Sequence, residues 1–332
     1  MGVAVVGAGA WGTALAKLLA DKGEAVTLWC REPEVRASIR DRQVNEAFLP
    51  EAPLPDTLEA TNELVEAVEG CDLIVFAVPS QFLRSVVAEL AIHVGHLGSE
   101  QRLVSATKGI EEGTLLRMSE VIADALGFMP DLTVLSGPSF AKEVCRGEPT
   151  ALVAASATTG SSTAVQARLA TRAFRIYTND DVVGVELGGA LKNVIALAVG
   201  VASGLGFGYN PKAALMTRGL KEMERLVEAM GGKRETLSGL AGVGDLVLTC
   251  TGEISRNRTV GVALGQGERL PDILNAMPQV AEGVSTTHAA VALARRHGVE
   301  MPIASHMERL LLGEVTAEQA VEGLLARRLG AE

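Results

Sequence analysis

The chain has 332 residues, of which 48% are hydrophobic and 3% aromatic, so two domains packed mainly by aliphatic side chains are expected. The formal net charge is −10, from 30 basic and 40 acidic residues. This balance argues against general nucleic-acid binding, which requires a basic face.

The first half alternates short β-rich runs with segments of helical periodicity. Strands are predicted at 2–7, 25–29, 72–78, 102–107, 131–136, 150–156 and 174–178, and helices at 11–22, 80–92, 114–126 and 161–171. Strands rich in Val, Ile and Leu that alternate with helices predict an α/β domain with a mostly parallel sheet covered on both faces.

The second half reads as helical throughout, and no convincing strand follows Thr178. Helices are predicted at 182–207, 211–230, 256–265, 284–297, 302–312 and 316–327. The change of pattern predicts an α/β domain over 1–179 and an all-α domain over 180–332.

A glycine-rich loop follows the first predicted strand. In "VVGAGAWG", Gly7, Gly9 and Gly12 form a GxGxxG pattern between a strand and a helix. Gly7 permits a tight turn, Gly9 lets a pyrophosphate approach the backbone, and Gly12 allows the helix to pack closely on the strand. This context predicts a Rossmann-like, dinucleotide-binding domain, and a glycine turn without a ligand is the alternative.

The end of the second predicted strand bears on cofactor choice. It reads "LWCRE", with Arg31 followed by Glu32. An arginine here accommodates the 2′-phosphate of NADP, whereas an acidic residue binds the ribose 2′-hydroxyl of NAD. Arg31 therefore favours NADP and Glu32 leaves NAD open, while an ordinary exposed arginine is the competing interpretation.

Lys192 is the unusual residue of the helical half. It is the only charged side chain between Glu186 and Lys212, in a segment that is apolar on every side, as buried helices are. Burial lowers the pKa of a lysine, which can then exchange a proton with an alcohol. The alternative is a lysine whose head group reaches the surface.

Other polar residues stand in apolar or glycine-rich settings. Lys108 follows a predicted strand, at the edge where open parallel sheets bind ligands. Gly137 and Ser139 follow the next strand and open a short helix, and Asp245 stands alone in a long uncharged stretch. Helix capping by Ser139 and Asp245, and a turn position for Lys108, are the simpler interpretations.

Arg256 and Arg258 flank Asn257 and form a compact cationic group that can grip a phosphate. A solvated helix face is the alternative for both arginines. Together with the glycine loop, Lys108 and Lys192, this group predicts a site at which an anionic substrate exchanges a proton and a hydride.

Signatures of other chemistries are not found in the sequence. It contains no GxSxG, HExxH or Walker A motif, and the five histidines have no evident set of metal-ligating partners, so no metal site is expected. The four cysteines form no CxxC pair and the start has no basic n-region, which predicts reduced thiols in a cytoplasmic protein. Glycines break the uncharged stretch 193–211, so membrane insertion is not expected.

The sequence resembles the NAD(P)-dependent glycerol-3-phosphate dehydrogenases of bacterial type along nearly its whole length. The resemblance rests on "GAGAWGTALA", "NEAFLP", "ATKGIE", "LSGPSFAKEV", "ELGGALKNVIALA", "NPKAALMTRGL", "LAGVGDLVLTC", "SRNR" and "VAEGVST". It implies reversible reduction of dihydroxyacetone phosphate to sn-glycerol 3-phosphate by NADH or NADPH, which supplies phospholipid synthesis. A homodimer through the helical domain is expected, because the apolar helix 193–203 can form an intrachain core or a subunit interface.

The resemblance also assigns roles to individual residues. The general acid/base lysine of the family falls on Lys192, which Asp245 is expected to orient. The implied substrate contacts are Lys108, Gly137, Ser139, Lys192, Asn193, Asp245, Thr249, Ser255, Arg256 and Asn257. The implied cofactor contacts, besides the three loop glycines, are Ala10, Trp11, Arg31, Phe48, Lys108, Ala141, Arg256, Val280 and Glu282. Ala10 and Phe48 replace the Ser and Tyr of many members, so two hydroxyl contacts are lost.

Two rival hypotheses remain from the sequence. One is another two-domain dehydrogenase that acts on a hydroxy acid or a sugar acid, although "TKG", "GPSFAKE" and "SRNR" supply phosphate-binding cations instead. The other is a regulator that senses NAD(H) without turning it over, which needs no lysine in an apolar helix.

Overall fold

The computed structural model describes residues 2–93, 101–277 and 280–326. These residues form two compact units. Unit 1 contains the chain up to Lys108 and from Leu116 to Val182, and unit 2 contains Gly109–Leu115 and the chain from Val183 onward. The short segment Gly109–Leu115 belongs to unit 2 because Ile110 lies in the hydrophobic core of that unit.

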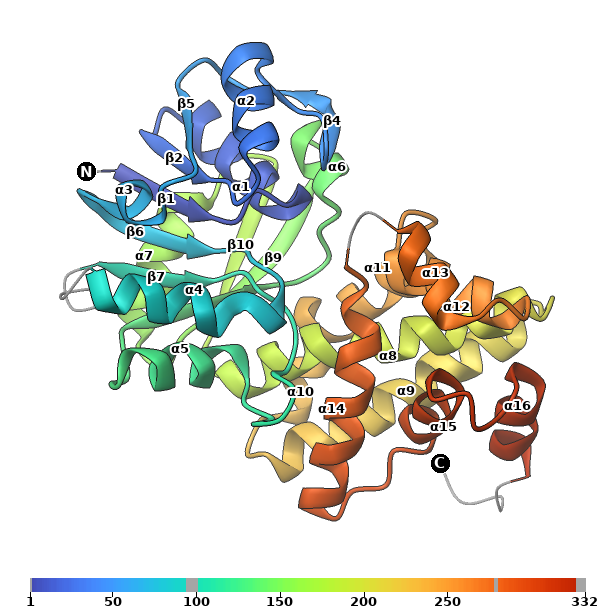
Figure 1. The fold of residues 1–332 in the computed structure, drawn as a ribbon. Coiled ribbons are helices and arrows are strands. Elements are labelled where there is room, and N and C mark those ends of the chain that lie inside the picture. The colour runs from blue at the N-terminus through green and yellow to red at the C-terminus, as the bar shows by residue number, and fades with distance from the viewer. Residues whose placement is uncertain (1, 94–100, 278–279, 327–332) are drawn as a thin grey trace. The chain divides into compact units, whose positions relative to one another are not determined.

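Unit 1 is built on an eight-stranded sheet with the spatial order β10-β9-β8-β7-β6-β1-β2-β5 (Figure 1). The strands are β1 (Gly2–Val6), β2 (Val26–Trp29), β5 (Leu58–Thr61), β6 (Cys71–Phe76), β7 (Arg102–Ser105), β8 (Leu132–Ser136), β9 (Thr150–Ala155) and β10 (Phe174–Asn179). Neighbouring strands are parallel except for β8 and β9, which are antiparallel. The mostly parallel sheet expected from the sequence is confirmed.

The alternation of side chains along each strand divides the core of unit 1 between the two sheet faces. Val3 and Val5 of β1 pack in a cluster with the helices α1, α2, α6 and α7, whereas Ala4 and Val6 pack in another with α3, α4 and α5. These helices are α1 (Ala10–Asp21), α2 (Pro33–Arg42), α3 (Leu64–Val68), α4 (Ser80–His93), α5 (Met118–Leu126), α6 (Ala141–Cys145) and α7 (Thr159–Leu169). Helices therefore cover both faces, as a buried parallel sheet requires.

Several details of unit 1 differ from the sequence expectations. Strand β5 and helices α2 and α3 were not predicted. The helix predicted from residue 114 begins only at Met118, because Leu115 has a φ of +63° and the Arg117 N–H donates to the Glu120 side chain as a cap. A hairpin of β3 (Val44–Asn45) and β4 (Leu49–Pro53) was not expected, because strands this short show no alternating pattern.

Unit 2 is helical among its described residues, in agreement with the sequence. Its helices are α8 (Val182–Gly204), α9 (Tyr209–Ala229), α10 (Arg234–Leu237), α11 (Asp245–Thr251), α12 (Arg256–Gly265), α13 (Leu270–Ala276), α14 (Glu282–His297), α15 (Pro302–Leu311) and α16 (Ala317–Leu325), with a π-helical turn at Leu240–Gly244. The helices α10, α11 and α13 and the π-helical turn were not predicted.

Helix α8 forms the centre of unit 2, where every residue from Gly184 to Ala202 is buried. It is the one helix among the described residues with the length and hydropathy of a membrane span, and 89% of that stretch is buried inside the structure. A core helix accounts for its composition, and the interpretation of 193–203 as an intrachain core is confirmed.

Candidate functional site

The glycine loop between β1 and α1 has the geometry expected of a phosphate-binding turn. Gly7 has a φ of +117°, and a Cβ at that position would lie 2.8 Å from the carbonyl oxygen of Ala77. A Cβ on Gly12 would lie 1.8 Å from the carbonyl oxygen of Gly7, so the helix packs against the loop. A Cβ on Gly9 would meet no atom within 4 Å, so this side of the loop is open to a ligand.

The N-terminus of α1 offers hydrogen-bond donors at this loop. The first backbone bond of the helix runs from Thr13 N–H to the Gly9 carbonyl (2.9 Å), so the N–H groups of Ala10, Trp11 and Gly12 precede it. Gly9 has no side chain to cap them, and the first turn contains no acidic residue. The buried Nε1 of Trp11 has no hydrogen-bond partner among the described residues. These donors and the helix dipole fit the pyrophosphate of a dinucleotide.

Phe48 and Ala141 lie on the rim of the same hydrophobic cluster as Ala10 and Trp11. An ion pair of 2.7 Å between the Lys142 Nζ and Glu51 carboxylate joins α6 to the β3–β4 hairpin, which carries Phe48. The hydrogen bond from Lys142 also lowers the pKa of Glu51. Four predicted cofactor contacts are thus held together in unit 1.

Arg31 follows β2 with 67% of its side chain exposed. Its Nε lies 3.6 Å from a Glu32 carboxylate oxygen, and its guanidinium carbon lies 5.6 Å from the centroid of the Phe82 ring. Phe82 is 46% exposed in the first turn of α4 and was not identified from the sequence. The signal available in the sequence was an aromatic residue in the helical segment that follows a predicted strand. Through Arg31, Phe82 joins the candidate cofactor contacts.

Lys108, Gly137 and Ser139 come together beyond the carboxyl ends of the neighbouring strands β7 and β8. The Lys108 Nζ donates to the Gly137 carbonyl at 3.0 Å, and the Ser139 hydroxyl donates to the same oxygen at 3.1 Å. The φ of Gly137 is +139°, a conformation that favours glycine. The predicted grouping of these residues at one sheet edge is therefore observed within unit 1.

In unit 2, Lys192 lies in the buried middle part of α8. Its head group therefore does not extend to the surface. Its Nζ is 2.7 Å from the Asp245 Oδ1 and donates to the Thr249 Oγ1 at 2.7 Å. Thr249 in turn donates to the backbone carbonyl of Asp245 at 2.6 Å. The adjacent Cys250 is buried, which raises the pKa of its thiol to about 12, so it remains protonated.

Asn193, Asn257 and Gly283 form a second polar chain beside this pair. Asn257 donates from Nδ2 to the Asn193 Oδ1 at 2.8 Å, and its Oδ1 accepts from the Gly283 N–H at 2.8 Å. All three residues are buried. The amide of Asn193 is therefore held with its oxygen toward Asn257, which sets the direction of its NH₂ group.

The start of α12 carries the predicted phosphate contacts. Ser255 is its N-cap and accepts from the Arg258 N–H at 3.4 Å. The Arg256 guanidinium donates to the Val280 carbonyl at 2.7 Å, so two predicted cofactor contacts of unit 2 meet each other directly. Glu282 begins α14 close by in sequence.

Glycines set the spacing between α8 and α12. A Cβ on Gly200 would lie 2.3 Å from the Arg258 carbonyl oxygen, and one on Gly261 would lie 2.2 Å from the Leu197 carbonyl oxygen. Gly204 and Gly265 repeat this contact one turn further along. The two helix backbones can approach this closely only because side chains are missing there. This packing places Asn257 against Asn193.

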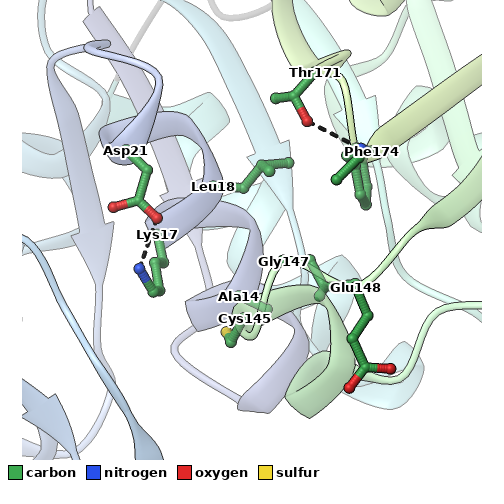
Figure 2. Close-up of a pocket in the computed structure, with 11 residues that line it drawn as sticks. Ala14, Lys17, Leu18, Asp21, Cys145, Gly147, Glu148, Thr171 and Phe174 are labelled. Atoms are coloured by element: carbon green, nitrogen blue, oxygen red, sulfur yellow. Dashed lines mark hydrogen bonds and ion pairs between the residues drawn. The ribbon is translucent and has the colours of Figure 1, made fainter.

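A small cavity of about 90 Å³ in unit 1 is distinct from these groups (Figure 2). It lies among α1, α6 and the start of β10, and the Lys17–Asp21 ion pair of 2.6 Å stands at its side. None of the predicted site residues lines it.

The fold and these side chains define a class of protein with a Rossmann-like nucleotide-binding unit and a helical unit built around a buried lysine. The family described as NAD-dependent glycerol-3-phosphate dehydrogenase matches the chain in both parts, its N-terminus over residues 2–161 and its C-terminus over residues 181–322. The chain belongs to this family.

Individual relatives extend the match over nearly the whole chain. The glycerol-3-phosphate dehydrogenase (NAD(P)+) of Geobacter sulfurreducens is 53% identical over 99% of this chain and 98% of its own. That of Koribacter versatilis is 51% identical over 98% of this chain and 97% of its own. The crystal structure of glycerol-3-phosphate dehydrogenase from Coxiella burnetii is 43% identical, covers 98% of both chains and has a TM-score of 0.93. The family predicted from the sequence is confirmed.

Proposed function

We propose that this chain catalyses reversible hydride transfer between NAD(P)H and dihydroxyacetone phosphate, which yields sn-glycerol 3-phosphate. The observation that carries the proposal is the buried Lys192, bonded to Asp245 and Thr249, in a chain that matches a dehydrogenase family in both parts.

Lys192 is the proposed general acid and base. In the reducing direction a bound NAD(P)H would supply the hydride for C2 of the ketone, and Lys192 Nζ would give its proton to the C2 oxygen. In the oxidising direction the same nitrogen takes the hydroxyl proton. Asp245 and Thr249 hold Nζ in one position, so that the proton is delivered along one direction.

The proposed substrate-binding roles rest on positively charged side chains and on hydrogen-bond donors that their neighbours hold in one orientation. Arg256 carries the positive charge for the phosphate, and Lys108 supplies a second cation that favours the developing negative oxygen. The remaining proposed substrate contacts are Gly137, Ser139, Asn193, Asp245, Thr249, Ser255 and Asn257. We assign residues 1–179 to cofactor binding and 180–332 to substrate binding and catalysis.

The cofactor-binding roles rest on the open glycine loop and the donors of α1. The proposed contacts are Gly7, Gly9, Ala10, Trp11, Gly12, Arg31, Phe48, Lys108, Ala141, Arg256, Val280 and Glu282. Arg31 contacts Glu32 and Phe82, and its guanidinium can bind a 2′-phosphate, which supports NADP use. Glu32 can accept a hydrogen bond from a ribose hydroxyl, which supports NAD.

We propose a cytoplasmic homodimer that supplies glycerol 3-phosphate to phospholipid synthesis, without nucleic-acid binding or membrane insertion. The acidic net charge of −10 and the burial of α8 support the last two points. Because α8 is buried inside unit 2, a dimer interface has to use other surfaces, and the exposed Phe207 and Tyr209 that follow α8 are available.

The test is the absorbance of reduced nicotinamide in the presence of dihydroxyacetone phosphate and either NADPH or NADH. Substrate-dependent oxidation of the reduced cofactor is expected. The ratio of the rates with NADPH and NADH measures the cofactor preference to which Arg31 is proposed to contribute. Binding of both cofactors without oxidation would favour a sensor of NAD(H). Oxidation of the cofactor with a keto acid, but not with dihydroxyacetone phosphate, would favour the other class of dehydrogenase.

A further inference from the structure

Asn45 joins three separate segments of unit 1 and is completely buried, with 0% of its surface exposed. Its Nδ2 donates to the Ala8 carbonyl at 2.8 Å and to the Thr13 Oγ1 at 2.8 Å. Its Oδ1 accepts from the Phe48 N–H at 3.1 Å. One amide therefore contacts the glycine loop, the first turn of α1 and the β3–β4 hairpin.

The orientation of this amide is fixed by its partners. The Ala8 carbonyl can only accept, and the Phe48 N–H can only donate, so exchanging the nitrogen and oxygen of Asn45 would break both bonds. Thr13 is also fully buried, and its hydroxyl donates to the same Ala8 carbonyl at 3.3 Å. Asn45 and Thr13 thus form a closed set of hydrogen bonds around the Ala8 oxygen.

This set determines where the next backbone N–H points. The Ala8–Gly9 peptide is trans, and in a planar trans peptide the C=O and the following N–H point in opposite directions. Because the Ala8 oxygen points inward to Asn45, the Gly9 N–H points outward. A Cβ on Gly9 would also meet no atom within 4 Å, so the loop is uncovered on the side to which that Cβ would point.

The same side chain places Phe48. The hairpin turn lies between β3 and β4, and the bond from the Phe48 N–H to Asn45 ties this turn to the loop. Phe48 packs on the rim of the cluster that contains Ala10 and Trp11. A movement of Asn45 would therefore disturb the loop and Phe48 together.

We propose that Asn45 is a positioning residue of the cofactor site, which turns the Gly9 N–H toward the diphosphate of a bound dinucleotide and fixes Phe48 beside it. The inference rests on the proposed function in that the ligand is a nicotinamide dinucleotide. Asn45 acts through the loop and the hairpin and has no contact with the ligand itself.

A structural role alone would have different consequences, and Ser38 provides the matched control. Ser38 is 4% exposed and also anchors the hairpin, since its hydroxyl donates to the Val44 carbonyl at 2.6 Å and accepts from the Glu46 N–H at 3.3 Å. It makes no bond to the glycine loop. Loss of hairpin anchoring is thus shared by Ser38→Ala and Asn45→Ala, whereas loss of loop orientation is specific to Asn45→Ala.

The experiment compares wild type, Asn45→Ala and Ser38→Ala. Binding of ADP-ribose, which carries the diphosphate, is measured by calorimetry, and kcat and KM are measured with NADPH. Asn45→Ala is expected to weaken ADP-ribose binding by about tenfold or more and to raise the KM for NADPH similarly. The kcat and the KM for dihydroxyacetone phosphate are expected to stay within about twofold at saturating NADPH, and Ser38→Ala to bind ADP-ribose within about threefold of wild type.

The inference is overturned if Asn45→Ala binds ADP-ribose as wild type does, if Ser38→Ala weakens binding equally, or if wild type does not bind ADP-ribose. If Asn45→Ala does not fold, the inference is tested by comparing ADP-ribose binding by Thr13→Val and Thr13→Ser. Only Thr13→Ser keeps the hydroxyl, so Thr13→Val must bind ADP-ribose at least about threefold more weakly than Thr13→Ser, and equal binding overturns the inference. Should wild type bind ADP-ribose but not reduce dihydroxyacetone phosphate, the proposed reaction fails while the positioning role stands.

Discussion

The Nζ of Lys192 lies 2.7 Å from Oδ1 of Asp245, and only 9% and 2% of these two side chains are exposed. Removing one partner of such a pair leaves an uncompensated charge in the core, which typically costs about 3–5 kcal/mol. The pair therefore couples the stability of unit 2 to the geometry of its proposed proton donor.

Asp245→Asn keeps the shape of the side chain but removes its charge. We expect the free energy of unfolding to fall by about 3 kcal/mol, because the ammonium of Lys192 loses its counter-charge, and kcat to fall by about a hundredfold or more. Urea unfolding and steady-state assays measure the two effects. Asp21→Asn, which breaks the more exposed Lys17 pair, is the control and should change stability by about 0.5 kcal/mol or less. Wild-type stability in Asp245→Asn would show that the pair is not important for the fold.

The glycine contacts of α8 and α12 give a second expectation. Gly261→Ala would place a methyl group 2.2 Å from the Leu197 carbonyl oxygen and push the helices apart. We expect the free energy of unfolding to fall by about 1–3 kcal/mol or more. The KM for dihydroxyacetone phosphate should also rise, because α12 carries Arg256 and Asn257. Gly208→Ala is the control, since its Cβ meets nothing within 4 Å and its φ is −73°. Equal stability and KM in both variants would contradict the proposed role of this packing.

The second and third glycines of the loop, Gly9 and Gly12, separate cofactor binding from folding. Gly9 has φ −64° and ψ 173°, which alanine adopts freely, so Gly9→Ala should fold within about 0.5 kcal/mol of wild type. Its methyl group would occupy the approach of the pyrophosphate and raise the KM for NADPH about tenfold or more. Gly12→Ala should instead destabilise the fold, because its Cβ would lie 1.8 Å from the Gly7 oxygen. Thermal unfolding and NADPH titration measure both, and unchanged NADPH affinity in Gly9→Ala would place the diphosphate elsewhere.

Buried thiols give a pH dependence with a defined sign. Burial raises the pKa of Cys30 and Cys250 to about 12 and that of Cys145 to about 11, from an ordinary value of 9.0. The unfolded chain releases these protons above pH 9.0 while the folded chain keeps them. Their stabilising contribution is therefore complete below pH 9.0 and is lost as the pH rises toward 11 and 12, by about 1.4 kcal/mol per pH unit for each thiol.

Urea unfolding between about pH 8 and pH 10.5 tests this expectation. Replacing Cys30 and Cys145 by alanine should make the alkaline loss of stability shallower, even if the variant is less stable at neutral pH. An identical slope in wild type and in the double variant would show that these thiols do not cause it.

Local patterns predicted the glycine loop and α8 because each depends on neighbouring residues. Helix α8 was expected at 182–207 and spans Val182–Gly204, since its predominantly apolar composition is the property that buries it. Gly7 and Gly12 could be assigned for the same reason, because a turn between a strand and a helix requires them at fixed spacing.

Contacts between distant segments were not accessible in this way. Nothing in the sequence around Asn45 shows that its amide meets the Ala8 carbonyl, 37 residues earlier in the chain. The π-helical turn Leu240–Gly244 was missed because its glycines suggest a loop, whereas in the structure Gly242 packs so closely on Leu237 that a Cβ would lie 2.1 Å from its carbonyl oxygen. Such positions follow from tertiary packing rather than from local propensity.

The most direct test is the turnover of Lys192→Met with dihydroxyacetone phosphate and NADPH. Lys221→Met, at an exposed lysine paired with Glu224, serves as the control. If Lys192 is the proton donor, kcat should fall by about 10²–10⁴ while the variant still binds NADPH, and Lys221→Met should turn over as wild type does. A folded Lys192→Met with a kcat within about tenfold of wild type would contradict the assignment and would leave the buried lysine without a catalytic role.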